Sequence, residues 1–198
     1  MIPPFIANNK QIIVTCMLLG ALVGGGHLPP KIDSLLFYAT ILAVALIGFA
    51  RNAYLNVLLV VSSTSFLLAW FHAFHDIHFD ILFCVSGLLC LLYGIATTVR
   101  FVLTSKEVSR REIFALVNCY LALGYFWALL YTLVQGIRPG SFNMPHQVER
   151  VMDTMVYFSF ATMTTVGYGD MSPHSMLAQR LAVTQAVMGQ FYFALVVA

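Results

Sequence analysis

Six long apolar segments constrain this chain more than any other feature of its sequence. They occupy residues 11–28, 33–50, 53–71, 81–103, 113–135 and 176–198. A helix needs about 20 predominantly apolar residues to cross the roughly 30 Å hydrocarbon core of a bilayer. Of the 198 residues, 60% are apolar and 9% are charged, whereas a soluble domain carries about 25% charged residues. The sequence therefore predicts an all-α membrane protein with six transmembrane helices in a lipid bilayer.

A further apolar segment, residues 152–163, is too short to cross the bilayer as a helix. It follows a polar loop, residues 136–150, and it carries Asp153 in its first turn, where a carboxylate stabilises a helix. Residues 162–170 then read TMTTVGYGD before the last long apolar segment begins. This order predicts a re-entrant helix and a loop at membrane depth, where irregular backbone needs surrounding protein.

The centre of this loop is Thr165-Val166-Gly167-Tyr168-Gly169. Glycine occupies alternate positions, and it adopts backbone dihedrals that other residues avoid. Four copies of such a loop can aim carbonyl oxygens at a common axis, where they replace the water shell of K⁺. The Thr165 hydroxyl adds one more oxygen at the inner mouth. The pattern therefore favours a potassium-binding loop.

The stretch 162–170 resembles the pore loop of tetrameric P-loop potassium channels, and the chain looks like a prokaryotic member with six membrane segments. The close resemblance covers about residues 150–198. It implies a fourfold homotetramer that conducts K⁺ passively, with no organic cofactor, and that is not an enzyme. The net charge of +2 gives no indication of a nucleic-acid partner, and no protein partner is evident. The resemblance assigns ion sites to Thr165, Val166, Gly167 and Tyr168, with Gly169 completing the filter.

The resemblance also implies residues that support the filter. They are Tyr157, Thr162, Thr164 and Asp170. Voltage-gated relatives usually carry two tryptophans at the positions of Tyr157 and Phe158, and some bacterial relatives carry a glutamate at the position of Ala161. Because this chain has neither, we expect Tyr157 to take their place as the hydrogen-bond partner of Asp170.

The last apolar segment carries a glycine at a position where the family often has a hinge. Gly189 lies 22 residues beyond Gly167, the first filter glycine. The alternative is that Gly189 only lets two helices pack closely, which is common in membranes. Phe193 and Val197 follow four and eight residues later, so this stripe either lines an inner vestibule or contacts lipid and other helices.

The resemblance divides the chain into three parts. Residues 1–103 form a four-helix domain with the layout of a voltage sensor, residues 104–112 a cytoplasmic linker, and residues 113–198 the pore domain. Steep voltage gating takes three or four charges per subunit, whereas the fourth segment carries only Arg100, near its inner end. We therefore expect a channel without conventional voltage gating.

The distribution of lysine and arginine indicates the orientation in the membrane. With the N-terminus inside, the inner side holds six of these cations and the outer side four. The inner cations are Lys10, Arg51, Arg100, Lys106, Arg110 and Arg111; the outer ones are Lys31, Arg138, Arg150 and Arg180. This excess follows the positive-inside rule. It predicts cytoplasmic termini in a multi-pass protein of the plasma membrane, which for a bacterium is the inner membrane.

Two other functions remain open. A secondary K⁺ transporter of related fold carries four loops in one chain, usually with one glycine each, whereas this chain has one loop and the full Gly-Tyr-Gly. A channel regulated by outer protons or metal is indicated by histidines, because all six of them map to the outer side. The candidate sensors of protons or metal are His72, His75, His78 and His174. A position at the membrane interface without a sensing role is the favoured explanation of these histidines.

The histidine distribution generates a prediction for pH. An imidazole in water titrates near pH 6.5, so lowering the outer pH from about 7.5 to 5.5 should add positive charge near the mouth and reduce the single-channel conductance. His174, four residues beyond Asp170, is the expected effector. His174→Gln should weaken the response, measured in planar bilayers. If conductance and open probability do not change with outer pH in either protein, the histidines have no sensing role.

Overall fold

A computed structural model describes residues 4–24, 77–105, 109–144 and 151–197. Five helices and two short strands make up this part of the chain. The helices are α1 (Pro4–Gly24), α4 (Ile77–Thr104), α5 (Arg110–Ile137), α6 (Val151–Met163) and α7 (Met176–Val197), and the strands are β1 (Phe142–Asn143) and β2 (Ser172–Pro173). The protein is therefore mostly helical in its described part, as the apolar segments predict.

Three of the six expected spans correspond to long helices. The expected spans 81–103, 113–135 and 176–198 are α4, α5 and α7. Among the residues that the structure describes, Cys84–Thr104 and Arg110–Ile137 combine the length and the hydropathy of a membrane span. The expected spans 33–50 and 53–71 lie outside the described residues. The helices thus support a membrane protein, and the count of six stays a prediction.

The first helix begins earlier than predicted. The first apolar segment was expected to begin at residue 11, yet α1 starts at Pro4 and continues to Gly24. Proline is well tolerated in the first helical turn, since the amide it lacks would have no helical partner there. Helix α1 therefore includes the polar residues Asn8, Asn9 and Lys10 near its start. Its apolar stretch covers Gln11–Leu22.

The connection between α4 and α5 is shorter than the expected linker 104–112. It spans residues 105–109, because Ser109 caps α5 and Glu112 belongs to the first turn of that helix. The Glu112 carboxylate accepts from the Ser109 backbone amide at 2.9 Å and from the Ser105 hydroxyl at 2.9 Å. This capping box satisfies amides that a helix start leaves open. So short a connection makes α4 and α5 antiparallel neighbours.

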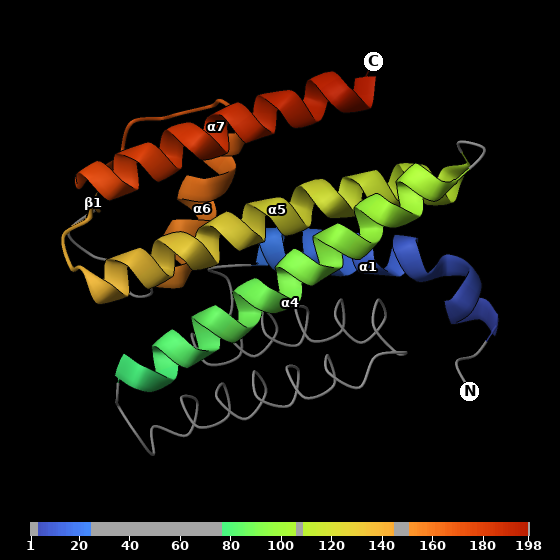
Figure 1. The fold of residues 1–198 in the computed structure, drawn as a ribbon, viewed down its shortest axis with the longest axis horizontal. Coiled ribbons are helices and arrows are strands. Elements are labelled where there is room, and N and C mark those ends of the chain that lie inside the picture. The colour runs from blue at the N-terminus through green and yellow to red at the C-terminus, as the bar shows by residue number, and fades with distance from the viewer. Residues whose placement is uncertain (1–3, 25–76, 106–108, 145–150, 198) are drawn as a thin grey trace.

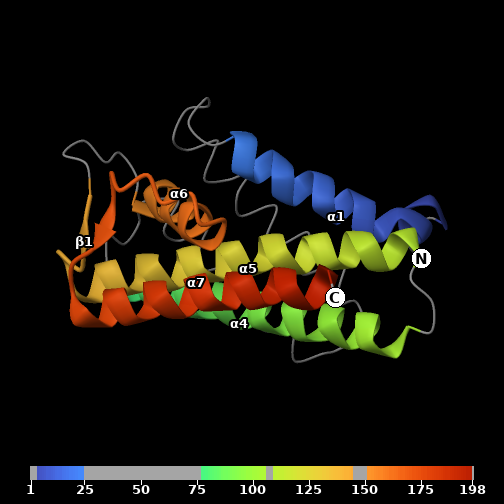
Figure 2. The same ribbon diagram turned by 90° about the horizontal axis from the view of Figure 1, so that it is seen from above.

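Helix α5 is the centre of the arrangement. It contacts α1, α4, α6 and α7, and Figure 1 shows α4 and α7 running along it. Figure 2 shows α1 on the opposite side of α5 from α4 and α7, with α6 near one end. In both views α1 begins and α7 ends at the end of the molecule that lies away from the strands.

Buried polar groups join α1 to α5. The Asn118 amide donates to the Gln11 side-chain oxygen at 2.8 Å, and its own oxygen accepts from the Thr15 hydroxyl at 2.7 Å. Seven residues farther along α5, the Tyr125 hydroxyl donates to the Leu18 carbonyl at 2.9 Å. Hydrogen bonds that satisfy buried polar groups fix one helix position against another, so α1 has a defined register on α5.

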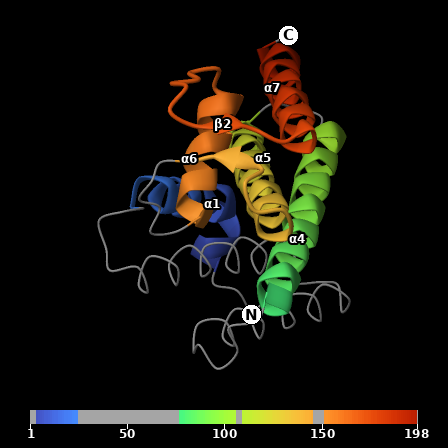
Figure 3. The ribbon, with the colours of Figure 1, turned by 90° about the vertical axis from the view of Figure 1, so that its left-hand side faces the viewer.

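The two strands hold together the ends of the segment that contains α6. β1 and β2 pair antiparallel, with Phe142 opposite Pro173 and Asn143 opposite Ser172. The chain between them therefore leaves and returns to the same end of the molecule, where Figure 3 shows β2 beside α6. Helix α6 has 13 residues, which at about 1.5 Å each is about 20 Å. The predicted short helix is therefore present and one residue longer than expected, and its re-entry into a membrane stays a prediction.

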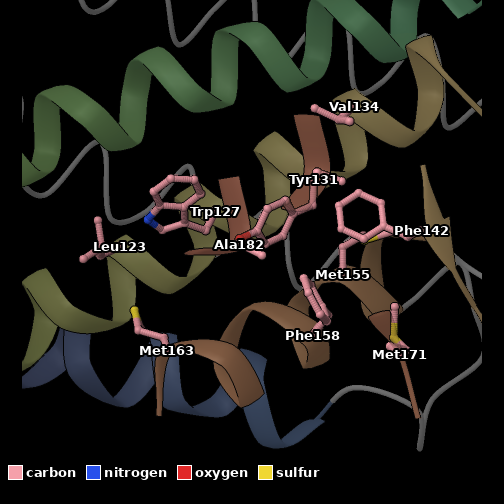
Figure 4. Close-up of a cluster of buried hydrophobic side chains, with 11 residues drawn as sticks. Leu123, Trp127, Tyr131, Val134, Phe142, Met155, Phe158, Met163, Met171 and Ala182 are labelled. Atoms are coloured by element: carbon pink, nitrogen blue, oxygen red, sulfur yellow. The ribbon is translucent and has the colours of Figure 1, made fainter. Parts of the chain in front are cut away.

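An aromatic cluster fills the space between this segment and the long helices (Figure 4). Tyr131, Phe142 and Phe158 pack edge to face in a triangle with ring centroids 5.3–5.5 Å apart. Trp127 lies 5.9 Å from Tyr131 on the same helix. Edge-to-face pairs add about 0.5–1.5 kcal/mol each to the burial of the rings. The cluster anchors α6 and β1 to α5.

A glycine lets α6 approach α5 closely. A Cβ atom added at Gly124 would lie 2.5 Å from the Phe160 ring, which is closer than real contacts allow. In contrast, a Cβ at Gly136 on the same helix would meet nothing within 4 Å. The contact between α5 and α6 therefore requires glycine at the first position and tolerates a side chain at the second.

This difference predicts opposite effects of two matched substitutions. Gly124→Ala should destabilise the protein by about 1–3 kcal/mol, because overpacking forces the Phe160 ring or the helix to move. Gly136→Ala should be neutral or stabilising, since alanine favours a helix over glycine. Thermal unfolding of the purified protein in detergent measures both. Equal midpoints for the two variants would contradict the close approach.

Candidate functional site

The loop that follows α6 is tied to the last turn of that helix. The amide of Thr164 donates to the Phe160 carbonyl at 2.9 Å, and the amide of Thr165 donates to the Thr162 carbonyl at 3.1 Å. The amide of Gly167 then reaches back to the Ala161 carbonyl at 3.2 Å. Residues 165–169, called the TVGYG loop below, thus begin on carbonyls that the end of a helix leaves free.

The TVGYG loop has positive φ at every second residue. The φ angles are 62° at Thr165, 53° at Gly167 and 80° at Gly169. Glycine enters this region freely, whereas a β-branched residue does so at a cost in strain. Thr165 is the one non-glycine residue with positive φ in the described part of the chain. A loop whose φ changes sign residue by residue is suited to turning its carbonyl groups to one side.

The side chains of the TVGYG loop are largely uncovered in a single chain. Tyr168 is 72% exposed and Val166 is 51% exposed. The Tyr168 ring stacks on Tyr157 of α6, with centroids 6.1 Å apart and planes 8° from parallel. The loop therefore contacts the helix that precedes it at Tyr168.

Asp170 links the end of the loop to α6. The Tyr157 hydroxyl donates to one carboxylate oxygen at 2.8 Å, and the Met171 amide donates to the other at 3.0 Å. The hydrogen bond predicted from the missing tryptophan and glutamate is therefore confirmed. A phenol is protonated at neutral pH, so Tyr157 is able to donate this hydrogen bond.

The exit of the loop is fixed by backbone contacts to the segment after α5. The amides of His174 and Ser175 both donate to the Ser141 carbonyl, at 2.8 Å and 3.1 Å. The His174 side chain is exposed beside this contact. Of the other histidines expected to act as sensors, His78 lies in the first turn of α4, within a segment expected to be a link, and His72 and His75 lie outside the described residues.

Gly189 contacts the end of α6. A Cβ atom there would lie 2.8 Å from the Met163 carbonyl oxygen and 3.0 Å from the Met163 side chain. Helix α7 continues through this position to Val197. Of the two interpretations of Gly189, this contact supports close packing, and the hinge stays a prediction.

The predicted inner stripe is only partly described. The Phe193 side chain is 47% exposed, and its ring lies 5.0 Å from Tyr120 of α5. Val197 is the last residue of α7, and its side chain lies outside the described set. One face of Phe193 thus contacts α5, and its vestibule role stays a prediction.

The predicted supports Thr162 and Thr164 act through the backbone and the helix end. Thr162 contributes the carbonyl that accepts from Thr165, and the Thr164 hydroxyl donates to the Phe160 carbonyl at 2.7 Å. Both residues therefore shape the start of the TVGYG loop.

The sequence analysis missed a buried polar group on α7. Gln185 is fully buried and bonds Tyr131 of α5 and Ser159 of α6. The signal was available, since a glutamine in the middle of an apolar segment needs a partner when buried. The identity of its partners depends on how three helices pack, which one segment does not reveal.

Comparisons with known proteins find similarity between the C-terminal region of this chain and ion channels. Residues 114–198 match a family described as ion channels. Two-pore potassium channel 3 of Arabidopsis thaliana is 34% identical over 86 residues, which are 43% of this chain and 17% of the plant protein. The chain thus spans a small part of that relative, and no solved structure matches it. The matched region contains α5, α6, the TVGYG loop and α7, so similarity and geometry support a helical membrane protein of the ion-channel kind.

The bond between Tyr157 and Asp170 generates a prediction. Tyr157→Phe keeps the ring that stacks on Tyr168 and removes the hydroxyl that holds Asp170, so in the channel expected from the sequence the current should inactivate faster. Tyr120→Phe is the matched control, because the Tyr120 hydroxyl bonds no described group. Current decay after a step to open conditions measures both. Unchanged decay in Tyr157→Phe would contradict a supporting role.

Proposed function

We propose that the protein is a potassium-selective channel that conducts K⁺ passively through four copies of the TVGYG loop. The observation that carries the proposal is the alternation of positive φ at Thr165, Gly167 and Gly169. A selectivity filter needs carbonyl oxygens at successive levels along the ion path, because they replace the water around K⁺. Ion sites are assigned to Thr165, Val166, Gly167 and Tyr168, with Gly169 ending the stack.

The exposure of the loop supports a homotetramer. Irregular backbone at membrane depth is tolerated where protein surrounds it or where it lines a wet cavity. In one chain, Val166 and Tyr168 are more than half exposed, and the Tyr168 ring stacks on Tyr157 of α6. Three further copies around a fourfold axis would cover these side chains and leave the carbonyl groups facing the axis.

The direction of α6 supports a cation path. The helix runs from the strand end of the molecule into the segment between the strands and ends at Met163, just before the TVGYG loop. A helix C-terminus carries a partial negative charge. Four such ends around the axis would stabilise a cation below the loop, before it enters the filter.

The helices outside this region carry few of the charges that a voltage sensor needs. Within α4, Arg100 is the only lysine or arginine, and it is exposed four residues before the helix ends. The proposal is therefore a channel whose opening depends weakly on voltage, with residues 1–103 as a helical domain beside the pore. It places both termini on the cytoplasmic side, and the common position of the start of α1 and the end of α7 supports this.

Reversal potentials in mixed K⁺ and Na⁺ solutions test the proposal. The purified protein in planar bilayers should prefer K⁺ strongly, because the loop carries the full set of residues 165–169. Near-equal permeabilities would contradict a potassium filter.

Two glycines offer a matched pair for the same measurement. Gly169 and Gly140 have similar positive φ, 80° and 85°, and a Cβ at either would meet nothing within 4 Å. Alanine should therefore strain the backbone similarly at both positions. Gly169→Ala should reduce the preference for K⁺, whereas Gly140→Ala, in the turn after α5, should keep it. Equal preference in the two variants would count against the TVGYG loop as the filter.

A further inference from the structure

A buried carboxamide connects helices α5, α6 and α7. The side chain of Gln185 on α7 is fully buried, as are Tyr131 on α5 and Ser159 on α6. The Tyr131 hydroxyl donates to the Gln185 oxygen at 2.5 Å. The Gln185 nitrogen donates to the Ser159 carbonyl at 3.0 Å and to the Ser159 hydroxyl at 2.7 Å.

The direction of these hydrogen bonds is fixed by chemistry. A backbone carbonyl only accepts, so the Gln185 atom that faces the Ser159 carbonyl must be the amide nitrogen. The oxygen then faces Tyr131, which donates to it. The Ser159 hydroxyl accepts from Gln185 and donates to the Gly124 carbonyl of α5 at 2.7 Å. These bonds therefore form one chain, called the relay below, that starts at the Tyr131 hydroxyl and ends at the Gly124 carbonyl, both on α5.

Small residues bring Gln185 to this position. Ala178, Ala182 and Gly189 are buried on the same face of α7: the two alanines lie seven and three residues before Gln185, and the glycine lies four residues after it. Small residues at such spacings let helices approach closely in a membrane. The neighbouring Val183 and Val187 are 64% and 47% exposed. Gln185 is thus the polar residue of a face that otherwise packs by close approach.

The relay acts on the part of α6 that leads into the loop. Ser159 lies one turn before Met163, where the helix ends, and two residues before Ala161, whose carbonyl accepts from the Gly167 amide. Gly189, one turn beyond Gln185 on α7, contacts Met163 itself. Helix α7 therefore touches α6 at two successive turns behind the TVGYG loop.

We propose that Gln185 is a positioning residue for the filter: its carboxamide, oriented by Tyr131, holds α6 through Ser159 and thereby maintains the conducting shape of the TVGYG loop. The proposal rests on the proposed channel function. The Gln185 carboxamide bonds Tyr131 and Ser159, which lie outside the TVGYG loop, so its effect should fall on how long the loop stays conducting, and the preference for K⁺ over Na⁺ should remain while the loop conducts.

Single-channel recording of Gln185→Leu tests the proposal. Leucine has a similar volume but can neither accept from Tyr131 nor donate to Ser159. Conducting bursts should become at least about tenfold shorter, because buried groups are left without a partner. Thr184→Val is the matched control, since the exposed Thr184 hydroxyl bonds only the Arg180 carbonyl of its own helix. It should leave the bursts unchanged. Bursts of equal length in Gln185→Leu and the unsubstituted protein would overturn the proposal.

A double variant separates positioning from general stability. Gln185→Leu alone leaves the buried Tyr131 hydroxyl unpaired, and it should lower the thermal midpoint in detergent. Adding Tyr131→Phe removes that hydroxyl, and removing both partners is often nearly neutral. The midpoint should then recover, but bursts should stay short because α7 still lacks its bond to Ser159. Recovery of burst length together with the midpoint would show a purely structural role and overturn the proposal.

The conservative variant Gln185→Glu adds a pH profile. A protonated carboxyl accepts from Tyr131 and donates to Ser159, whereas an ionised one faces the Ser159 carbonyl with like charge. Bursts should therefore approach their original length at low pH and shorten as pH rises, relative to the unsubstituted protein at each pH. A flat profile would contradict the assigned hydrogen bonds. Failure of the unsubstituted protein to pass K⁺ would instead reject the proposed function.

Discussion

The need to support non-helical backbone within the membrane determines most of this structure. Residues 164–170 form no regular element, and a bilayer offers no water to their amide and carbonyl groups. The protein meets this need from three directions: the end of α6 accepts from the amides of Thr165 and Gly167, Tyr157 holds Asp170, and β1 holds the exit. These contacts hold one side of the loop. In the proposed tetramer, the exposed side of the loop would contact neighbouring copies and ions.

Helix α5 makes this support possible because it contacts every other described helix. Its partners change along its length: Asn118 and Tyr125 bond α1, Gly124 receives the Phe160 ring of α6, and Tyr131 bonds α7. Each contact depends either on a glycine, which has no side chain, or on a polar side chain that has a hydrogen-bond partner. In a membrane, where apolar burial drives association weakly, these are the contacts that specify how helices pack. The position of the loop is therefore determined largely by residues that lie far from it in sequence.

The sequence predicted what depends on local pattern. The bounds of α6 agree within one residue, because a short apolar segment between polar stretches leaves little choice, and the bond from Tyr157 to Asp170 followed from two departures from a family pattern. The start of α5 was placed too late although Ser109 and Glu112 have the spacing of a capping box, so that signal was readable. Gln185 was different: its burial shows that it needs partners, but only the packing of three helices shows which.

The two contacts between α7 and α6 also restrict how the proposed pore can open. Gln185 and Gly189 are fixed against Ser159 and Met163, so a movement of α7 that leaves the TVGYG loop intact has to occur beyond Gly189. There the helix is held by the Tyr192 hydroxyl, which donates to the Leu116 carbonyl of α5, and by ring contacts to Tyr120. Opening at the inner end must therefore break or carry along an aromatic contact with α5, whether Gly189 acts as a hinge or only as a packing residue. Helix α5, through that contact, is the element by which the remaining helices can act on the pore.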